Sequence, residues 1–332
     1  MGGGDPERRS DRSAVRRAPV VGAWQAGPVL ALVPDVPPAP QADVERLAEA
    51  LGGRRVAVLT GAGVSTEAGI PDYRGEGTRA RARAPVQYAD FLRSEIARRR
   101  YWARAVVGWP RFRSRAPGPG HRALAALERA GCVDPVITQN VDRLHQRAGA
   151  EDVVELHGAL AEVRCLSCGM IVDRDEVQDR FLECNPGFER REVAMAPDGD
   201  AELPDELVRG FRIVDCPACF GVLKPHVVFF GESVPRPRVE RAFARVEAAE
   251  VLLVVGSSLA VFSGYRFVRR AHELGRAVVV LNHGPTRADG AARLKLEARI
   301  GDVLPRVLRA LTGRSVPGEE GSGPPPGPGP ER

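Results

Sequence analysis

The chain has 332 residues, a formal net charge of +5 and a hydrophobic fraction of 43%, which suffices for one large domain and a smaller one. Its mean hydropathy of −0.21 and its lack of a long uncharged apolar run argue against a membrane span. The first residues show no apolar segment of the kind that a secretory signal needs. We therefore expect a cytoplasmic protein without a membrane partner.

The two ends of the chain differ in composition from its centre. Residues 1–40 are rich in Gly, Pro and Arg, and residues 313–332 are rich in Gly, Pro and Glu. Such segments bury too little apolar surface to order themselves, so we expect a disordered leader and a disordered tail. Between them we expect one folded domain over 41–160 and 222–312, interrupted by a lobe over 161–221.

An arginine-rich segment covers residues 74–115, where twelve arginines stand against three acidic residues. Apolar residues recur there at helical intervals, which predicts a small helical module within about 75–118, with Trp102 and Trp109 in its core. The positive charge could attract nucleic acid or an acidic ligand. A solvated helical face is the simpler explanation, so nucleic acid is not an expected partner.

A glycine-containing turn follows the first apolar run of the folded part. The run Arg55–Thr60 predicts a buried strand, and Gly61-Ala62-Gly63 leads from it into an expected helix start near Ser65. This layout can bring backbone N–H groups to a pyrophosphate, and glycines permit the close approach. On its own, the pattern also describes an ordinary tight turn.

Further apolar runs end in glycine or polar residues, and these ends are candidates for one shared crevice. Val136–Thr138 is followed by Gln139, Asn140 and Asp142, Val153–Glu155 by His157, Val251–Val255 by Gly256-Ser257-Ser258, and Ala277–Leu281 by Asn282. In an open parallel sheet, ligands bind at the carboxyl ends of the strands. We therefore predict an α/β fold, a doubly wound parallel sheet of the Rossmann type.

Two Cys-x-x-Cys pairs, Cys165/Cys168 and Cys216/Cys219, enclose most of the expected lobe. In a reducing compartment such pairs predict a tetrahedral zinc site rather than disulfides, although disulfides are the alternative. Four thiolates leave no open coordination position on the metal. We expect one structural zinc ion per chain.

The combination of these motifs resembles the sirtuins, and in detail their class II branch, which includes many bacterial members. The motifs that carry the resemblance are, in chain order, Gly61 to Arg74, Gln139 to Asp142, Glu155 to Gly158, the two cysteine pairs, Lys224 to Glu232, Gly256 to Ser258 and Asn282 to Thr286. The resemblance covers about residues 43–311. It departs from the family pattern at His226, a position that is commonly Asp or Asn.

The resemblance implies an NAD-dependent protein lysine deacylase that uses NAD as a co-substrate and releases nicotinamide. Its implied partners are proteins that carry acylated lysines. The residues that it assigns to NAD are Gly61, Ala62, Gly63, Ser65, Asp72, Tyr73, Arg74, Gln139, Asn140, Val141, Asp142, Gly256, Ser257, Ser258, Asn282, His283, Gly284 and Ile300.

Asn140, Asp142 and His157 are the catalytic residues that the resemblance implies, with His157 as the general base for a ribose hydroxyl. An imidazole titrates near working pH, which suits that role; taken alone, His157 could equally be a satisfied core histidine. The substrate peptide is expected to pair with Val227, Val228, Phe229, Gly231 and Glu232. Tyr101 and Arg104 have the spacing with which sirtuins that act on acidic acyl groups hold the carboxylate, so the resemblance implies an acidic-acyl preference as one hypothesis.

Other activities stay open at this point. The same fold could act as a mono-ADP-ribosyltransferase, a lipoamidase or an acidic-acyl deacylase. A protein of another class, a non-catalytic NAD sensor or a nucleic-acid-binding zinc protein, would use the arginine-rich segment as its footprint. The sequence leaves the oligomeric state and the protein targets open.

Overall fold

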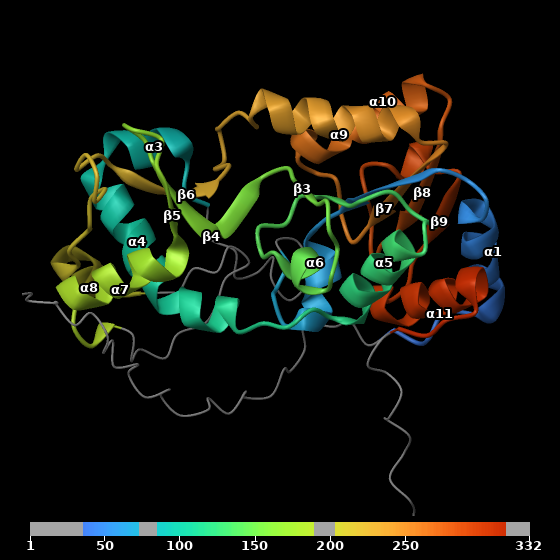
Figure 1. Ribbon diagram of the computed structural model, residues 1–332, viewed down its shortest axis with the longest axis horizontal. Helices are drawn as coiled ribbons and strands as arrows, with labels where there is room; N and C mark the ends of the chain where they lie inside the picture. The colour runs from blue at the N-terminus through green and yellow to red at the C-terminus, as the bar shows by residue number, and fades with distance from the viewer. Residues whose placement is uncertain (1–35, 73–84, 189–202, 317–332) are drawn as a thin grey trace, which may run out of the picture. The chain divides into compact units, whose positions relative to one another are not determined.

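The computed structural model of the protein describes residues 36–72, 85–188 and 203–316 (Figure 1). Tyr73 and Arg74 lie outside the described residues, and so do most of the predicted leader and tail. Val316, within the predicted tail, is buried against the cluster that contains the last helix. The described part of the chain has no helix long and apolar enough to cross a membrane.

The main sheet is parallel throughout and has the strand order β3-β2-β1-β7-β8-β9. Its strands are β1 (Val56–Thr60), β2 (Ile137–Thr138), β3 (Val154–Glu155), β7 (Val251–Val255), β8 (Ala277–Leu281) and β9 (Leu294–Leu296). Thr60 is in register with Thr138 on one side and with Val255 on the other. The strand order reverses between β1 and β7, and such a switch point is where open α/β sheets bind ligands. The predicted fold class is confirmed.

Helices cover both faces of this sheet, which is why its strands are continuous apolar runs. They are α1 (Gln41–Leu51), α5 (Pro119–Arg129), α9 (Arg236–Ala248), α10 (Phe262–Glu273) and α11 (Ile300–Thr312). Val58 and Leu253 pack on the side of α1, α5 and α11. Leu59 and Leu252 face the opposite way and pack with α9 and α10, which lie together in Figure 1.

A second, antiparallel sheet has the order β5-β4-β6 and supports the cysteine cluster. Its strands are β4 (Gly158–Cys165), β5 (Ile171–Asp173) and β6 (Leu223–Val227), and the helices around it are α3 (Tyr88–Arg93), α4 (Glu95–Arg113), α7 (Arg174–Cys184) and α8 (Asp205–Gly210). Trp102 and Trp109 are buried in a shared core with Phe181 and Phe211. The core role predicted for both tryptophans is confirmed.

Three local features complete the description of the fold: the helix after Gly61, the pairing of β6 and two short helices. The helix after Gly61 is a 3₁₀ helix, η1 (Ala62–Ala68), which ends at Gly69 with φ 79°. Strand β6 ends at Val227 and pairs with β4 rather than with the parallel sheet. The remaining short elements are α6 (Leu144–Arg147) and η3 (Asp289–Ala291).

Candidate active site at the switch point of the sheet

The turns after β1 and β7 touch each other at the switch point. Gly61 N–H donates to Val255 O at 3.1 Å, and Gly63 N–H donates to Gly256 O at 2.8 Å. A Cβ on Gly61 would lie 2.7 Å from Ser257 Cβ, and one on Gly63 would lie 2.9 Å from Gly256 Cα. The glycines are therefore required by the packing of two turns, a reason that the sequence pattern alone did not supply.

A hydrogen-bonded chain of polar side chains lies beside these turns. Asn140 Nδ2 donates to Gly61 O at 3.0 Å and to Ser65 Oγ at 3.1 Å, and Ser65 Oγ donates to Asp142 Oδ2 at 2.7 Å. Leu144 N–H donates to the other carboxylate oxygen of Asp142 at 2.9 Å. Both oxygens are held, so the carboxylate is fixed in place before any ligand arrives. The structure thus brings Asn140, Asp142 and Ser65 together, as the sequence implied.

Arg143, the residue after Asp142, adopts the left-handed backbone conformation with φ 59°. For a residue with a long side chain this conformation is strained and needs outside support. Its guanidinium pairs with Glu155 at 3.1 Å and with Glu162 at 2.5 Å. Glu162 also accepts from His226 Nδ1 at 2.8 Å. This ion-pair network holds the backbone that presents Asp142.

Two buried histidines lie under the polar chain, with ring centroids 4.9 Å apart. His145 Nε2 is 2.9 Å from Thr60 Oγ1, and His121 Nε2 is 3.3 Å from Ser65 Oγ. Burial lowers the pKa of each histidine to about 3, so both rings are neutral at physiological pH. His121 lies near the start of α5, where a cap or a surface residue is expected. It does accept the Gly118 N–H at the start of α5, but it is fully buried.

His157 has hydrogen-bond partners on both ring nitrogens. Nδ1 is 2.8 Å from Gln139 O, and Nε2 is 2.8 Å from Ser263 Oγ. Because a carbonyl only accepts, Nδ1 carries the hydrogen of the neutral ring and Nε2 keeps its lone pair. Burial lowers the pKa of His157, and Arg266 and Arg238 act in the same direction. The ring is thus in the form that a general base needs.

The segment after β6 is anchored by Lys224, a buried lysine to which the sequence motifs assign no individual role. Its Nζ lies 2.9 Å from Glu232 Oε2, donates to Val227 O at 2.5 Å and lies 4.4 Å from the centroid of the Phe229 ring. Glu232 Oε2 also accepts the Phe229 N–H at 2.8 Å. Burial lowers the pKa of Lys224. The Val228 N–H donates to His157 O at 2.8 Å, so this segment is tied directly to the base.

The other predicted site residues lie around the same strand ends or next to them. Gln139 Nε2 donates to Ser257 Oγ at 2.8 Å, and Asn282 Nδ2 donates to the carbonyls of His283 and Gly284 within the turn after β8. Ile300 packs beneath Gly256. Ala62 begins η1, Asp72 ends the described part of the loop that follows, and Val141, Ser258 and Gly231 lie in the turns after β2, β7 and β6.

Tyr101 and Arg104 belong to α4, and Tyr101 lies against the segment after β6. The Tyr101 ring is buried, with its centroid 5.2 Å from that of Phe229. Arg104 follows one turn later, and its Nε is buried without a hydrogen-bond partner in the part of the chain that the structure describes. The two residues thus share a helix next to the candidate peptide segment.

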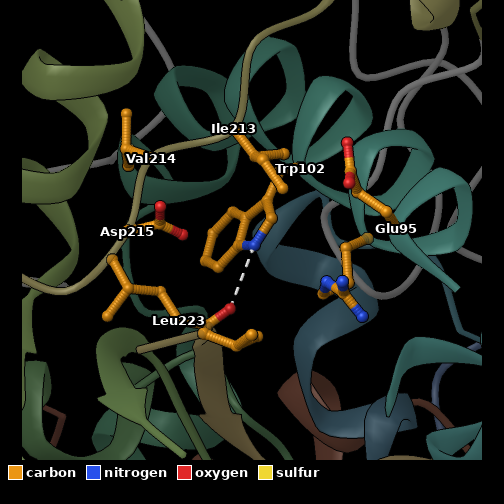
Figure 2. Close-up of a pocket in the computed structure, with 8 residues that line it drawn as sticks. Glu95, Trp102, Ile213, Val214, Asp215 and Leu223 are labelled. Atoms are coloured by element: carbon orange, nitrogen blue, oxygen red, sulfur yellow. Dashed lines mark hydrogen bonds between the residues drawn. The ribbon is translucent and has the colours of Figure 1, made fainter. Parts of the chain in front are cut away.

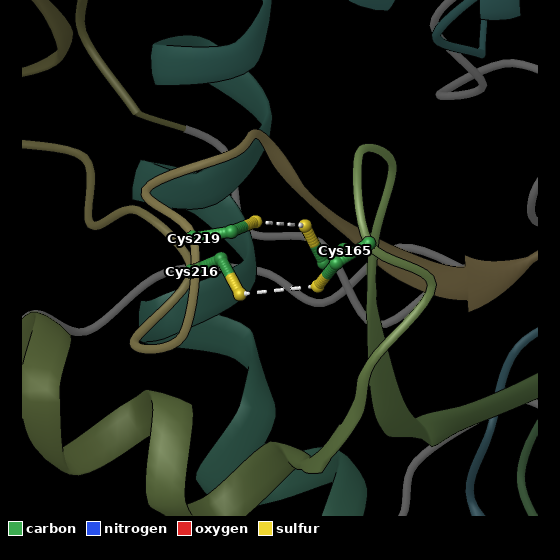
Figure 3. Close-up of side chains that lie close together, drawn as sticks. Cys165, Cys216 and Cys219 are labelled. Carbon is green, nitrogen blue, oxygen red and sulfur yellow. Dashed lines mark hydrogen bonds between the residues drawn. The ribbon is translucent and has the colours of Figure 1, made fainter.

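The four cysteines predicted to bind zinc are brought together between two loops, as Figure 3 shows. Their sulfur atoms all lie within 4.8 Å of one another, with 3.5 Å between Cys165 and Cys219 and 3.8 Å between Cys168 and Cys216. Zinc–sulfur bonds of about 2.3 Å at tetrahedral angles place sulfurs about 3.8 Å apart. The donor set and its spacing therefore fit a structural zinc ion.

A separate cavity of about 290 Å³ lies where α4 meets the lobe. It is lined by Glu95, Arg98, Trp102, Ile213, Val214, Asp215, Val222 and Leu223. Figure 2 shows the Trp102 ring reaching toward Leu223, and its Nε1 donates to the Leu223 carbonyl at 3.2 Å. None of the residues that line this cavity belongs to the strand-end site. The hydrogen bond of Trp102 connects α4 directly to Leu223, which follows the second cysteine pair in the chain.

Comparison with known proteins identifies the family. Residues 61–263 match the Sir2 family. The chain is 48% identical over 288 residues to the NAD-dependent protein deacylase Sirt4 of Drosophila melanogaster, covering 86% of this chain and 92% of that protein. It is 50% identical to the NAD-dependent protein deacetylase 1 of Streptomyces coelicolor, covering 86% and 95%. The protein belongs to the Sir2 family.

Solved structures agree with the fold. One described as "Structural Basis for the Mechanism and Regulation of Sir2 Enzymes" is 30% identical, with a TM-score of 0.64 over 82% of this chain and 98% of that chain. Another, described as "Sir2-p53 peptide-NAD+", is 27% identical, with a TM-score of 0.62 over 80% and 98%. A third relative, the mitochondrial NAD-dependent protein lipoamidase sirtuin-4 of Bos taurus, is 48% identical over 82% of this chain and 89% of its own length.

Proposed function

We propose that the protein is an NAD-dependent lysine deacylase that removes acyl groups, acetyl first among them, from protein side chains. The observation that carries this proposal is the position of His157. Its Nδ1 is bonded to Gln139 O, one residue before Asn140, its Nε2 is bonded to Ser263 Oγ, and its carbonyl accepts the Val228 N–H of the segment after β6. Acyl transfer from a peptide requires a general base, a fixed carboxylate and a segment along which the peptide can bind.

The residues at the strand ends suit NAD. The turns after β1, β7 and β8 supply glycines, and the side chains of Ser65, Asn140, Ser257 and Asn282 supply hydrogen-bonding groups for hydroxyls and amides. When bound, NAD would supply a weak nicotinamide–ribose bond and the hydroxyl that accepts the acyl group. Asp142 is fixed by Ser65 and the Leu144 N–H, so it can receive a ligand amide without reorganisation.

The chain's own residues would act mainly through position. Asn140 and Gln139 follow β2 directly, so their positions are fixed by the sheet. Residues held in this way would position the bound reactants and reduce the entropy lost when the reacting groups meet. His157 would take the proton of the attacking hydroxyl on Nε2, because its Nδ1 already carries a hydrogen that is bonded to Gln139 O. Proton transfer to a positioned base contributes on the order of a hundredfold to ten-thousandfold in rate.

The substrate would bind along Val227, Val228, Phe229, Gly231 and Glu232 and along the loop 259–264. Main-chain pairing gives affinity with little demand on sequence, which suits a modifier of several proteins. A related solved structure contains a p53 peptide together with NAD. The zinc ion, held by Cys165, Cys168, Cys216 and Cys219, would fix the lobe from which this edge is built. A cytoplasmic location remains part of this proposal.

The acyl group itself has two further candidates. Relatives from Bos taurus and Homo sapiens are described as lipoamidases, and an apolar wall formed by Tyr101 and Phe229 suits an apolar acyl chain. Among the described residues the Nε of Arg104 has no hydrogen-bond partner, which instead favours an acidic acyl chain, since a carboxylate would satisfy it.

A panel of one peptide sequence carrying acetyl-, lipoyl- or glutaryl-lysine tests the proposal. With NAD present, mass spectrometry should show loss of the acyl group from at least one peptide, and none without NAD. Arg104→Met should lower the glutaryl-to-acetyl rate ratio if Arg104 contacts the acyl group, and an unchanged ratio removes that candidate. Transfer of ADP-ribose to protein without deacylation would favour a mono-ADP-ribosyltransferase. No turnover with any peptide would favour a non-catalytic NAD-binding protein.

A further inference from the structure

Ser263 lies in the first turn of α10, on the opposite side of the His157 ring from Gln139. Its Oγ is 2.8 Å from His157 Nε2. Because Gln139 O fixes the hydrogen of the neutral ring on Nδ1, the Ser263 hydroxyl must donate to Nε2. The nitrogen that should act as the base is therefore already bonded to a hydroxyl of the protein.

The packing of α10 explains how this hydroxyl reaches the ring. Gly264 follows Ser263, and a Cβ at Gly264 would lie 2.4 Å from Gln139 Oε1 and 2.7 Å from its Cδ. The absence of a side chain thus lets the first turn of α10 press against Gln139. The turn before it is also held, because Leu259, with φ 56°, donates its N–H to Ser257 Oγ at 3.3 Å.

Gln139 acts on His157 in two ways: it bonds to the ring directly, and it packs against the residue next to Ser263. Its carbonyl holds His157 Nδ1, and its side chain bonds to Ser257 and packs against Gly264. Ring orientation and the place of the Ser263 hydroxyl are set by one residue. Ser263 itself is only half-buried, so its hydroxyl can turn aside when a ligand hydroxyl approaches Nε2.

We propose that Ser263 is a positioning residue for the acyl-transfer step: its hydroxyl holds the His157 ring with Nε2 ready, in the place that the reacting hydroxyl of the substrate later takes. This inference rests on the proposed deacylase function. In the step itself, the hydroxyl that accepts the acyl group would lose its proton to Nε2, and its oxygen would bond to the acyl carbon. The bond from that carbon to the lysine nitrogen would break, and the nitrogen would leave with the electron pair and take up the proton. Ser263 neither gains nor loses a proton and only gives up its hydrogen bond.

The test separates the transfer step from the step before it. Full-length wild type, Ser263→Ala and Ser263→Thr are compared in deacylation of an acetyl-lysine peptide and in peptide-dependent exchange of labelled nicotinamide into NAD. Ser263→Ala should lower kcat for deacylation about tenfold, since part of the contribution of a positioned base is lost. Its peptide KM should stay within about twofold of wild type, because main-chain pairing of the peptide with the loop 259–264 does not use the Ser263 side chain. Its nicotinamide exchange should also stay within about twofold, because exchange does not need the base.

Ser263→Thr keeps the hydroxyl and should restore deacylation to within about threefold of wild type. Ser114→Ala removes an exposed serine hydroxyl that bonds to Arg111 O and serves as the matched control. Equal deacylation rates for Ser263→Ala and wild type would overturn the inference, and so would a parallel loss of exchange and deacylation, which indicates a merely structural role. Absence of both reactions in the wild type would overturn the proposed function, and the inference with it.

Discussion

Lys224 and Glu232 form a nearly buried ion pair across the turn that ends β6. The two charged groups are 2.9 Å apart, and their side chains are 5% and 22% exposed. The lysine is also bonded to Val227 O, and the carboxylate is also bonded to the Phe229 N–H. One buried lysine therefore sets the shape of the segment that we propose binds the substrate peptide.

Lys224→Met should destabilise the protein and weaken peptide binding. The variant leaves Glu232 half-buried without its cation, which costs about 2–4 kcal/mol in free energy of unfolding, and the peptide KM should rise while the KM for NAD stays near wild type. Denaturant unfolding and steady-state kinetics measure the two effects. Lys295, the other lysine of the chain, pairs with Asp289 near the surface, so Lys295→Met is the control and should cost less than about 1 kcal/mol.

The buried histidine pair should make the protein acid-sensitive. Burial lowers the pKa of His121 and of His145 from 6.5 to about 3. Below about pH 6.5 the unfolded chain binds protons that the folded chain does not, so the free energy of unfolding falls as the pH drops toward 3. At pH 5 the loss is about 2 kcal/mol for each ring.

Denaturant titrations at pH 7 and pH 5 measure this difference. His121→Gln should reduce the difference by about half, because one of the two rings is gone. His272→Gln, which replaces an exposed histidine of α10, controls for histidine replacement in general. An equal pH dependence in wild type and His121→Gln would contradict the assignment of His121 as a buried neutral ring.

Removal of zinc should disturb the lobe before it disturbs the parallel sheet. The indoles of Trp102 and Trp109 bond to Leu223 O and to Asp175 Oδ1, both in or next to the lobe, so chelation should shift tryptophan fluorescence. Cys216→Ser should purify with less than one zinc ion per chain and show the shifted spectrum without a chelator. Cys184→Ser replaces an exposed cysteine outside the cluster and should keep both zinc and spectrum. Fluorescence that does not respond to metal loss would count against a structural role.

Gly63→Ala should affect the contact between the turns after β1 and β7. Its Cβ would lie 2.9 Å from Gly256 Cα, where neither backbone can yield easily. We expect a loss of about 1–3 kcal/mol in free energy of unfolding and a higher KM for NAD. Gly290→Ala places its Cβ in open space and should be neutral in both assays. A Gly63→Ala protein with wild-type stability and NAD affinity would refute the packing argument.

The sequence predicted those parts of the site that local patterns encode. The cysteine spacing predicted a cluster, and in the structure the four sulfur atoms lie within 4.8 Å of one another. Strand-end residues such as Asn140 and Asp142 could be expected to converge because parallel strands end at one edge of the sheet. The roles given to individual residues remain predictions, since geometry alone does not show a reaction.

Tertiary contacts account for what the sequence could not supply. Ser263 and His157 are 106 positions apart in the sequence. The pairing of β6 with β4 depends on tertiary contacts, which local hydrophobic periodicity does not predict. His121 illustrates the same limit: its place at the start of α5 correctly suggested a cap, but its burial depends on packing against Ser65 and His145. The glycines after β1 are required because a Cβ there would clash with Gly256 and Ser257, nearly two hundred residues away in the sequence.

The most direct test of the account is nicotinamide release from NAD, measured for wild type and His157→Ala with and without an acylated peptide. We predict release that depends on the peptide in the wild type. Acyl removal should fall at least about a hundredfold in His157→Ala, because the base at the strand ends is gone. Nicotinamide release at the same rate without peptide, or full acyl removal by His157→Ala, would contradict the central claim.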